Sequence, residues 1–515
     1  MKSRVRPLWL LSVSAIFILL AVGCNDTLRQ FIVPVPSPTG NPQSLEHAIT
    51  LSTNPAPLSN GSDMHIDVSG DTSAGIVPVG PNPVFLGKTI NRAFVINAGD
   101  GTPSVPPTVS IYTALLPQGA TPSIVTLPTT GPNAVQTPVG GSTSSTSDIY
   151  IANRDSNNVS VISGGVLAVT TTLQLPVGAH PVMIAGNQAN NKIFVINQGN
   201  GTVTEIATLD NTITNTFTVG ASPVWGVMSS DGLFVFVVNQ GDNTVSVIDT
   251  SLDAIVPCAV GPSCPSGNAI VVGSSPNFAF YEPKLKRVYV SNTGPDSATG
   301  KGVVSVIAAN GINSTANPPV LPVKLKDILL TGGTPTSVTA LSDGTKAYAA
   351  LGNCPTGVNH TTIVSTLQNA ANCTGNQVAV IDANALQQTG SITVGAGAIT
   401  IDSSPDASKV FVVSARDITT VRDNVHLPNC TGNNCLPAPP LPDRTFTTPA
   451  IYVIPTDTNV PLVTPVDPFV VSNPLPTFHV PQQDPLCVPA IDPNFNNKVP
   501  QPCLLQTPFV VRTFP

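Results

Sequence analysis

The chain has 515 residues and a formal net charge of −7, and only 10% of its residues are charged. This acidic balance excludes the basic surface that nucleic-acid binding requires, since the densest basic cluster, residues 284–287, fits a solvated turn. The mean hydropathy of +0.23 argues against disorder over the whole chain. The 53 prolines and 40 glycines are typical of an all-β protein with many loops.

The first 23 residues predict an export signal. Lys2, Arg4 and Arg6 precede an apolar run over residues 8–22, and small residues stand just before Cys24. This arrangement resembles a bacterial lipobox, which predicts cleavage before Cys24 and lipidation of that cysteine. A plain signal peptide with a free Cys24 is the alternative. The apolar run is too short for a permanent membrane span, which needs about 20 residues.

Residues 24–60 predict a lipid-anchored tether. They are rich in Pro, Ser and Asn and have little apolar periodicity. Such sequence stays extended and holds a domain away from its anchor.

An internal repeat follows over residues 61–457. Each copy begins with G-x-x-P, found at residues 80–83, 119–122, 178–181, 220–223, 273–276 and 332–335, with a seventh copy at Gly395 that has Ala398 in place of proline. Two apolar segments follow each copy. The first segments are residues 93–97, 149–153, 193–197, 233–239, 288–292, 347–351 and 410–413. The second segments are residues 108–112, 158–162, 202–206, 244–248, 304–307, 377–381 and 450–454.

Short apolar runs between Gly, Asn and Asp turns predict strands joined by hairpins. A period of roughly 40 to 60 residues matches a four-stranded propeller blade with insertions. We therefore expect a seven-bladed β-propeller of four-stranded antiparallel blades, with loop insertions and a Pro-rich tail. Residues 64–79 would complete the last blade, with residues 76–79 as its outer strand. The Asn that recurs at the end of the first of the two apolar segments predicts a turn residue that bonds its own backbone.

Several of the first apolar segments end in sequences such as Phe-Val-Ile-Asn and Tyr-Val-Ser-Asn, and in one repeat the second segment and the two residues after it read Thr-Val-Ser-Val-Ile-Asp-Thr. These segments resemble the YVTN repeat of bacterial β-propeller proteins, over about residues 64–457. The resemblance implies a surface-layer or lactonase-like propeller and leaves the function open, because that family serves many tasks.

Apart from Cys24 the chain has eight cysteines, an even number for an exported protein. Each lies near a partner in a Pro-, Gly- or Asn-rich loop, which favours four local disulfides. These join Cys258 with Cys264, Cys354 with Cys373, Cys430 with Cys435, and Cys487 with Cys503. The sequence alone leaves the connectivity open. Residues 458–515 form a Pro-rich, disulfide-stapled tail that packs along the ring or extends from it.

No pattern of catalytic or metal-ligating residues stands out. The six histidines have no metal spacing, and the G-x-x-P segments contain no Asp or Glu. His180, inside one such segment, and Trp225, just after another, are candidates for a pocket in the central channel. A turn histidine and a packed tryptophan are the simpler interpretation. We expect no catalytic residues, no metal and no cofactor.

These features favour a non-catalytic binding or scaffold propeller at the bacterial cell envelope. It would be an exported, monomeric lipoprotein of the outer membrane or cell surface, with a periplasmic face as another possibility. Its partners would be the membrane, through the lipid, and an envelope protein or polysaccharide bound by the inserted loops. The alternative is a lactonase-like or redox propeller enzyme with a ligand site at the central channel.

Overall fold

The structure is a computed structural model, and it describes part of the chain as strands and loops. The described ranges are residues 47–53, 60–68, 72–89, 92–100, 102–113, 121–265, 267–357, 372–421, 444–459, 477–478 and 507–514. They contain no helix. All of them lie in the compact unit Leu45–Pro515, whereas the other compact unit, Met1–Ser44, lies outside the described residues. The expected signal peptide and Cys24 therefore fall outside them.

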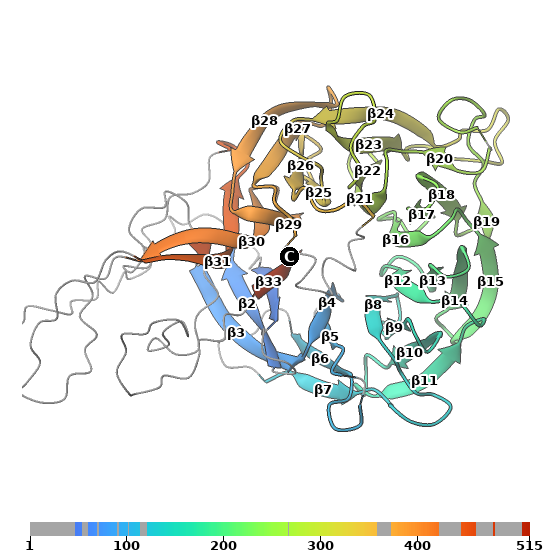
Figure 1. Ribbon diagram of the computed structural model, residues 1–515. Coiled ribbons are helices and arrows are strands. Elements are labelled where there is room, and N and C mark those ends of the chain that lie inside the picture. Colours follow the sequence, from blue (N-terminus) through green and yellow to red (C-terminus); the bar gives the residue numbers. More distant parts are fainter. Residues whose placement is uncertain are drawn as a thin grey trace, which may run out of the picture. The chain divides into compact units, whose positions relative to one another are not determined.

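The strands form eight antiparallel sheets arranged as the blades of a propeller (Figure 1). From the centre outward, blade 1 contains β33 (Thr507–Phe514), β1 (His47–Thr53), β2 (Asn60–Asp67) and β3 (Thr72–Pro81). Blade 2 contains β4 (Pro83–Lys88), β5 (Arg92–Asn97), β6 (Thr108–Thr113) and β7 (Ser123–Thr126). Blade 3 contains β8 (Pro138–Thr143), β9 (Ile149–Asn153), β10 (Asn158–Ile162) and β11 (Val169–Gln174).

The next three blades repeat this order. Blade 4 contains β12 (Pro181–Ala185), β13 (Lys192–Asn197), β14 (Thr202–Ala207) and β15 (Thr212–Thr218). Blade 5 contains β16 (Pro223–Met228), β17 (Phe234–Asn239), β18 (Thr244–Asp249) and the short β19 (Ala254–Ile255) and β20 (Ile270–Val271), which both pair with β18. Blade 6 contains β21 (Pro276–Glu282), β22 (Arg287–Asn292), β23 (Gly302–Ala308) and β24 (Val323–Leu330).

The last two blades complete the set. Blade 7 contains β25 (Ser337–Ala340), β26 (Lys346–Leu351), β27 (Gln377–Asp382) and β28 (Gln387–Thr393). Blade 8 contains β29 (Ala396–Ser403), β30 (Lys409–Val421), β31 (Arg444–Pro455) and β32 (Thr477–Phe478).

The expected number of seven blades is wrong, because the chain ends build an eighth. Strand β1 pairs with β33 in an antiparallel register that runs from His47↔Phe514 to Thr53↔Thr507. Residues 64–79 therefore belong to blade 1, together with β1 and the C-terminal strand, and do not complete the last blade. Strand β1 lies in the range we assigned to a tether, and β33 in the range assigned to a tail. Blade 1 therefore takes its inner strand, β33, from the C-terminal part of the chain and its other three strands, β1 to β3, from the N-terminal part.

The two apolar segments of each repeat are strands, as predicted, and they form the second and third strands of blades 2–8. One G-x-x-P copy, at residues 119–122, does not precede an inner strand as the repeat predicts. The copy at residues 119–122 precedes β7, an outer strand, whereas the inner strand of blade 3 starts later, at Pro138. The near-continuous apolar runs are explained by burial on both faces, since every residue of β17 is buried.

The recurrent asparagines join the second and third strands of a blade. Asn239 is fully buried, and its side-chain amide donates hydrogen bonds of 3.0 Å to the hydroxyls of Thr244 and Ser246. Corresponding hydrogen bonds are made by Asn97, Asn153, Asn197 and Asn292. The asparagines are structural, as expected, but they bond mainly the neighbouring strand, and we call this arrangement the asparagine latch.

In blades 2, 5 and 6 the latch leaves no room for a side chain on the glycine of G-x-x-P. A Cβ on Gly220 would lie 2.6 Å from the side-chain nitrogen of Asn239, and Gly80 and Gly273 meet their own asparagines similarly. In blades 2 and 6 the backbone N–H of the same glycine also donates to the third-strand serine, Ser110 or Ser305. The loop before each of these blades is thus fixed to the interior of the blade.

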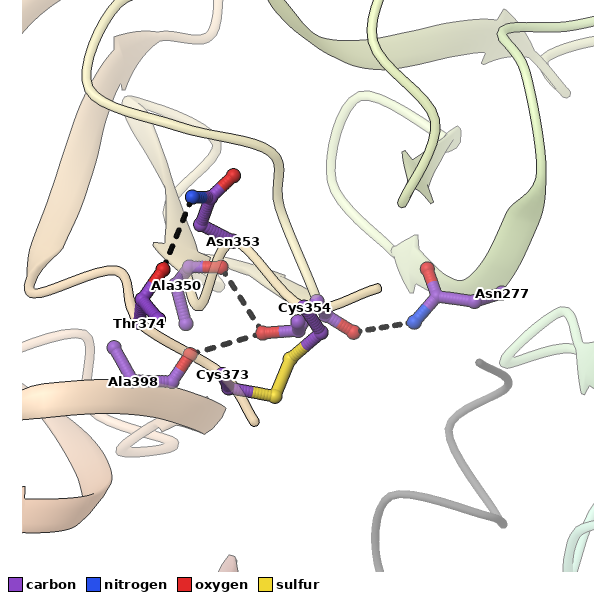
Figure 2. Close-up of a disulfide and its surroundings, with 8 residues drawn as sticks. Asn277, Ala350, Asn353, Cys354, Cys373, Thr374 and Ala398 are labelled. Atoms are coloured by element: carbon purple, nitrogen blue, oxygen red, sulfur yellow. Dashed lines mark hydrogen bonds between the residues drawn. A yellow bond between two sulfur atoms is a disulfide. The ribbon is translucent and has the colours of Figure 1, made fainter. Parts of the chain in front are cut away.

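Two of the four expected disulfides lie within the described residues, and both are present. Cys258 bonds Cys264, and Cys354 bonds Cys373. The second bond follows β26 and lies beside Ala398 of β29 (Figure 2). Both of its cysteines are buried and pack with residues of blades 1, 2 and 8. It therefore contributes to the core between blades. Cys430, Cys435, Cys487 and Cys503 lie outside the described residues.

Ending the chain at Gln506 should open the ring, because it removes β33 and leaves the edge of β1 unpaired. We expect a lower melting temperature and species larger than the monomer in size-exclusion chromatography. Removing Pro515 alone is the control and should change neither. A truncated protein that melts and elutes like the full chain would contradict closure by β33.

Gly220→Ala should lower the free energy of unfolding by about 1–3 kcal/mol, because its new methyl group overlaps the buried Asn239. Gly390→Ala is the matched control, since a Cβ there has its nearest neighbour at 3.9 Å. Chemical denaturation measures both variants. Equal stability of the two would mean that the latch tolerates a side chain at Gly220.

Candidate functional site

The inner strands define two ends of the central channel. Consecutive strands within a blade are antiparallel, so every inner strand runs in the same direction. All inner strands from β4 to β21 start at the loops that carry Pro83, Pro138, Pro181, Pro223 and Pro276. We call this the loop end of the channel, and the opposite end, where the inner strands finish, the strand end.

His180 and Trp225 have different surroundings at or near the loop end. His180 is exposed, has a positive φ of 45°, and its backbone N–H donates to Asn157. Trp225 is 5% exposed, donates its indole N–H to the carbonyl of Ala279, and packs against Phe278 with ring centroids 4.7 Å apart. Trp225 therefore joins blades 5 and 6, and a pocket formed with His180 stays a prediction.

The strand end gathers charged side chains from three blades. Lys88 is the last residue of β4, Asp402 lies near the end of β29, and Arg512 lies near the end of β33. The backbone of Thr513 links the blades through two hydrogen bonds. Its carbonyl accepts a hydrogen bond of 3.1 Å from the Lys88 ammonium, and its N–H donates a hydrogen bond of 2.9 Å to the Asp402 carboxylate. Figure 1 shows β33, in red, at the centre of the ring. We call Lys88, Asp402 and Arg512 the strand-end triad.

Charges of both signs act on the two cations of the triad. Burial lowers the pKa of Lys88, the nearby Arg512 lowers it further, and Asp402 opposes both effects. Burial likewise lowers the pKa of Arg512, again opposed by Asp402. By its solvent-accessible surface, however, Lys88 is an exposed residue, and this exposure weakens the effect of burial on its pKa. Asp402 thus favours the charged forms of both cations, whereas Arg512 disfavours that of Lys88.

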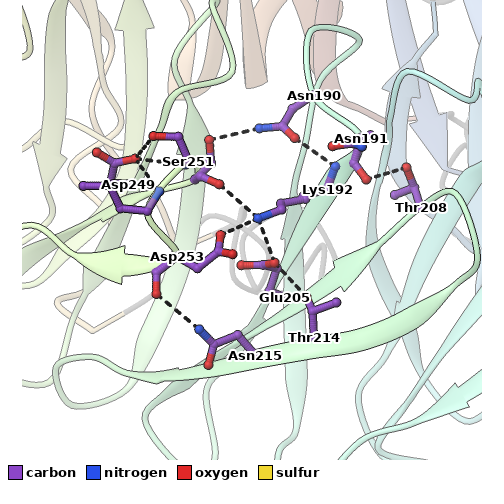
Figure 3. A network of polar contacts seen from close by, with 12 residues as sticks. Asn190, Asn191, Lys192, Glu205, Thr208, Thr214, Asn215, Asp249, Ser251 and Asp253 are labelled. Carbon is purple, nitrogen blue, oxygen red and sulfur yellow. Dashed lines mark hydrogen bonds and ion pairs between the residues drawn. The ribbon is translucent and has the colours of Figure 1, made fainter.

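Lys192 shows how this chain balances a cation that has a structural role (Figure 3). Its ammonium forms ion pairs with Glu205, at 3.1 Å, and with Asp253. It also donates a hydrogen bond to the carbonyl of Thr250. Although burial lowers the pKa of Lys192, its hydrogen bonds to Asp253 and Glu205 raise it overall. Two carboxylates thus lie next to this one cation between blades 4 and 5.

A second polar cluster is buried between blades 1 and 2. Asp63 and His65 of β2 are 0% and 2% exposed, and Tyr112 of β6 donates its hydroxyl to Asp63. The rings of His47 and Tyr112 lie 6.1 and 5.7 Å from that of His65. Neither ring nitrogen of His65 has a hydrogen-bond partner among the described residues. Burial raises the pKa of Asp63 well above its usual value, and burial together with His47 lowers that of His65 to about 4.

An open groove of about 530 Å³ lies outside the channel, between the outer strands β24 and β28. Its polar lining includes Lys326, Asp327, Gln387 and Gln388. Gln388 of β28 connects the two sides of the groove. Its side-chain carbonyl accepts a hydrogen bond of 2.8 Å from the backbone N–H of Thr331, which directly follows β24. The groove belongs to the outer rim of blades 6 and 7, away from the strand-end triad.

The described residues contain no group of three His, Cys, Asp or Glu side chains arranged to hold a metal ion. Nor does the part of the chain that the structure describes include a helix long and apolar enough to cross a membrane.

The sequence did not reveal the strand-end triad. Lys88 stands at an ordinary hairpin, and Arg512 stands in the segment that we interpreted as a tail. The one available signal was the apolar run beside Arg512 at the C-terminus, which resembles the strands of the repeats.

Comparison with solved structures supports the propeller fold. Dihydro-heme d1 dehydrogenase NirN in complex with DHE superimposes with a TM-score of 0.52 and 10% identity, over 83% of this chain and 75% of that one. The periplasmic gluconolactonase PpgL of Pseudomonas aeruginosa has a TM-score of 0.46 and 13% identity, over 68% and 97%. A 6-phosphogluconolactonase homologue from Bacteroides uniformis has a TM-score of 0.45 and 14% identity, over 68% and 97%.

No protein-family model matches the sequence, and no curated protein matches it. The chain is therefore similar to known β-propellers in fold, and membership of the YVTN-repeat family stays a prediction.

His65→Leu should reduce the loss of stability in acid. A histidine whose pKa is lower in the folded state contributes stability that is lost as pH falls from about 6.5 toward 4. Asp63, with its raised pKa, acts in the opposite sense, since its contribution is present at low pH and is lost as pH rises. The variant should therefore lose about 2 kcal/mol less than the natural protein between pH 7 and pH 4.5.

Urea denaturation at the two pH values measures this difference. His180→Ala, which removes an exposed histidine, is the control and should keep the natural pH dependence. An unchanged pH dependence in His65→Leu would show that His65 does not resist protonation in the folded state.

Proposed function

We propose that this protein is a small-molecule propeller whose ligand site lies at the strand end of the central channel, which is the alternative that the sequence left open. One observation carries the proposal: Lys88, Asp402 and Arg512 come from the inner strands of three blades and interact at one place. Charged groups that converge in a restricted, partly buried space are typical of binding and catalytic sites.

The scaffold hypothesis rested on the lack of acids in the G-x-x-P segments. Those segments lie at the loop end, whereas the triad lies at the strand end, so that lack has no bearing on a site in this part of the channel. Binding through the inserted loops, the lipid on Cys24 and the envelope location remain proposals.

Lactone hydrolysis is a reaction that the triad is equipped to assist. Water would attack the carbonyl carbon, and the carbonyl oxygen would gain negative charge next to the two cations, which stabilise an oxyanion. Asp402 would accept the proton from the attacking water and return it to the ring oxygen as the C–O bond breaks. The product is a hydroxy acid, and all atoms and electrons are accounted for.

The test is a δ-lactone hydrolysis assay on the purified full chain. Asp402→Asn should lower kcat by a factor of about 100 or more, because it removes the proton acceptor while keeping the size of the side chain. His180→Ala should leave kcat unchanged. Turnover that persists in Asp402→Asn, or hydrolysis abolished by His180→Ala, would move the site away from the strand end.

A further inference from the structure

We propose that the groove between β24 and β28 binds an extended peptide segment of a partner protein, which adds to the free edge of β24 as a further strand. Figure 1 shows the two strands at the outer edge of neighbouring blades. The groove is separate from the central channel, so this inference goes beyond the proposed function and does not depend on it.

Both walls of the groove are formed by edge strands. β24 is the last strand of blade 6 and β28 is the last strand of blade 7, and among the described residues each pairs only with the strand before it. The outer edge of such a strand presents N–H and C=O groups that its own sheet does not use, and extended peptides bind by pairing with edges of this kind. The volume of the groove, about 530 Å³, falls within the range of ligand sites.

Gln388 already makes in this groove the hydrogen bonds that a peptide would make. Its side-chain Oε1 accepts a hydrogen bond of 2.8 Å from the backbone N–H of Thr331, and its Nε2 donates one of 3.3 Å to the carbonyl of the same residue. A primary amide thus supplies both the acceptor and the donor that a paired strand supplies. Because Thr331 directly follows β24, the main chain at this end of the strand is turned toward the groove and accepts an amide partner.

The side chains that line the groove indicate the composition of the peptide. Ile328 and Leu386 are buried, apolar members of the lining. The carboxylate of Asp327 pairs with the ammonium of Lys324 at 2.6 Å, so its charge is balanced within blade 6. Lys326 is exposed, lines the groove and has no ion pair among the described residues. A peptide with apolar residues and an acidic residue complements this lining.

β24 differs from other outer strands in its exposed apolar side chains. Val323, Leu325 and Leu329 are 49%, 42% and 40% exposed, whereas β11 and β28, with the sequences VTTTLQ and QQTGSIT, have no large apolar side chain exposed to this extent. An apolar edge of this kind is typical of a surface that pairs with another chain. None of the residues that line the groove is aromatic, so a sugar ring has no flat side chain on which to stack, and this favours a peptide over a polysaccharide.

A library of linear heptapeptides displayed on phage, selected on the purified full chain, tests the inference. The selected peptides should alternate apolar residues with polar ones and include Asp or Glu, and fluorescence anisotropy of labelled synthetic copies measures their affinity. Lys326→Glu should weaken binding tenfold or more, because it reverses the charge of the groove. Lys301→Glu, on an exposed loop of the same blade, is the matched control and should leave the affinity unchanged.

Ser391→Trp should weaken binding tenfold or more, because the large side chain fills the groove from β28. Thr393→Trp is the matched control, since it adds the same side chain at an exposed position of the same strand that does not line the groove. Both variants should melt like the natural protein. Lactone hydrolysis should be the same in Ser391→Trp as in the natural chain, so failure of the channel site and failure of the groove are distinguishable.

N-methylation of alternate peptide amides separates strand pairing from contacts of side chains alone. One of the two alternate patterns should abolish binding, because its methyl groups replace the N–H groups that face β24, and the other should retain most of the affinity. Equal effects of the two patterns, or a selection that yields no peptide sensitive to Ser391→Trp, would overturn the inference. Cellohexaose that binds where peptides do not, or a dimer in sedimentation velocity that Ser391→Trp dissociates, would also overturn it, since the occupant would be a polysaccharide or a second copy of this chain.

Discussion

The pairing of β1 with β33 is the constraint on which the ring depends. Each inner strand packs against the inner strands of the neighbouring blades, and β33 occupies the place between β29 and β4. Blades 2–8 are each built from a continuous stretch of chain, whereas blade 1 joins residues from the two ends. Its formation carries the largest loop-closure cost of any blade. The propeller is therefore complete only when the most distant parts of the sequence have met.

The polar groups that depart from the repeat pattern gather around this junction. Blades 2–6 carry the asparagine latch, but the corresponding positions are Leu351 in blade 7 and Ser414 in blade 8. Blade 1 instead contains the buried Asp63 and His65, and it shares the strand-end triad with blades 2 and 8. Where the repeat sequence is most regular, each side chain serves the fold. Departures from local regularity are expected at functional sites, and here they coincide with the closure of the ring.

The repeat made most of the fold predictable, because the strands of blades 2–8 follow one another and leave periodic apolar segments. The eighth blade was missed for a physical reason. Strand β33 pairs with a strand from the opposite end of the sequence, so nothing local shows that residues 507–514 pair with residues 47–53. The triad was missed for the same reason, since Lys88, Asp402 and Arg512 become neighbours only through that pairing. His180 and Trp225 drew attention because they stand near a motif, and that motif marks the loop end of the channel.

Closure and ligand binding are consequently linked. The backbone of Thr513 accepts from Lys88 and donates to Asp402, so the groups proposed to bind the ligand also hold β33 in place. A ligand that binds only the closed ring stabilises that ring by mass action. Conversely, fraying of β33 would carry Arg512 away from Lys88 and remove the paired cations. An arrangement of this kind explains why a C-terminal strand, at a position where chains usually fray, carries a charged residue into the centre of the molecule.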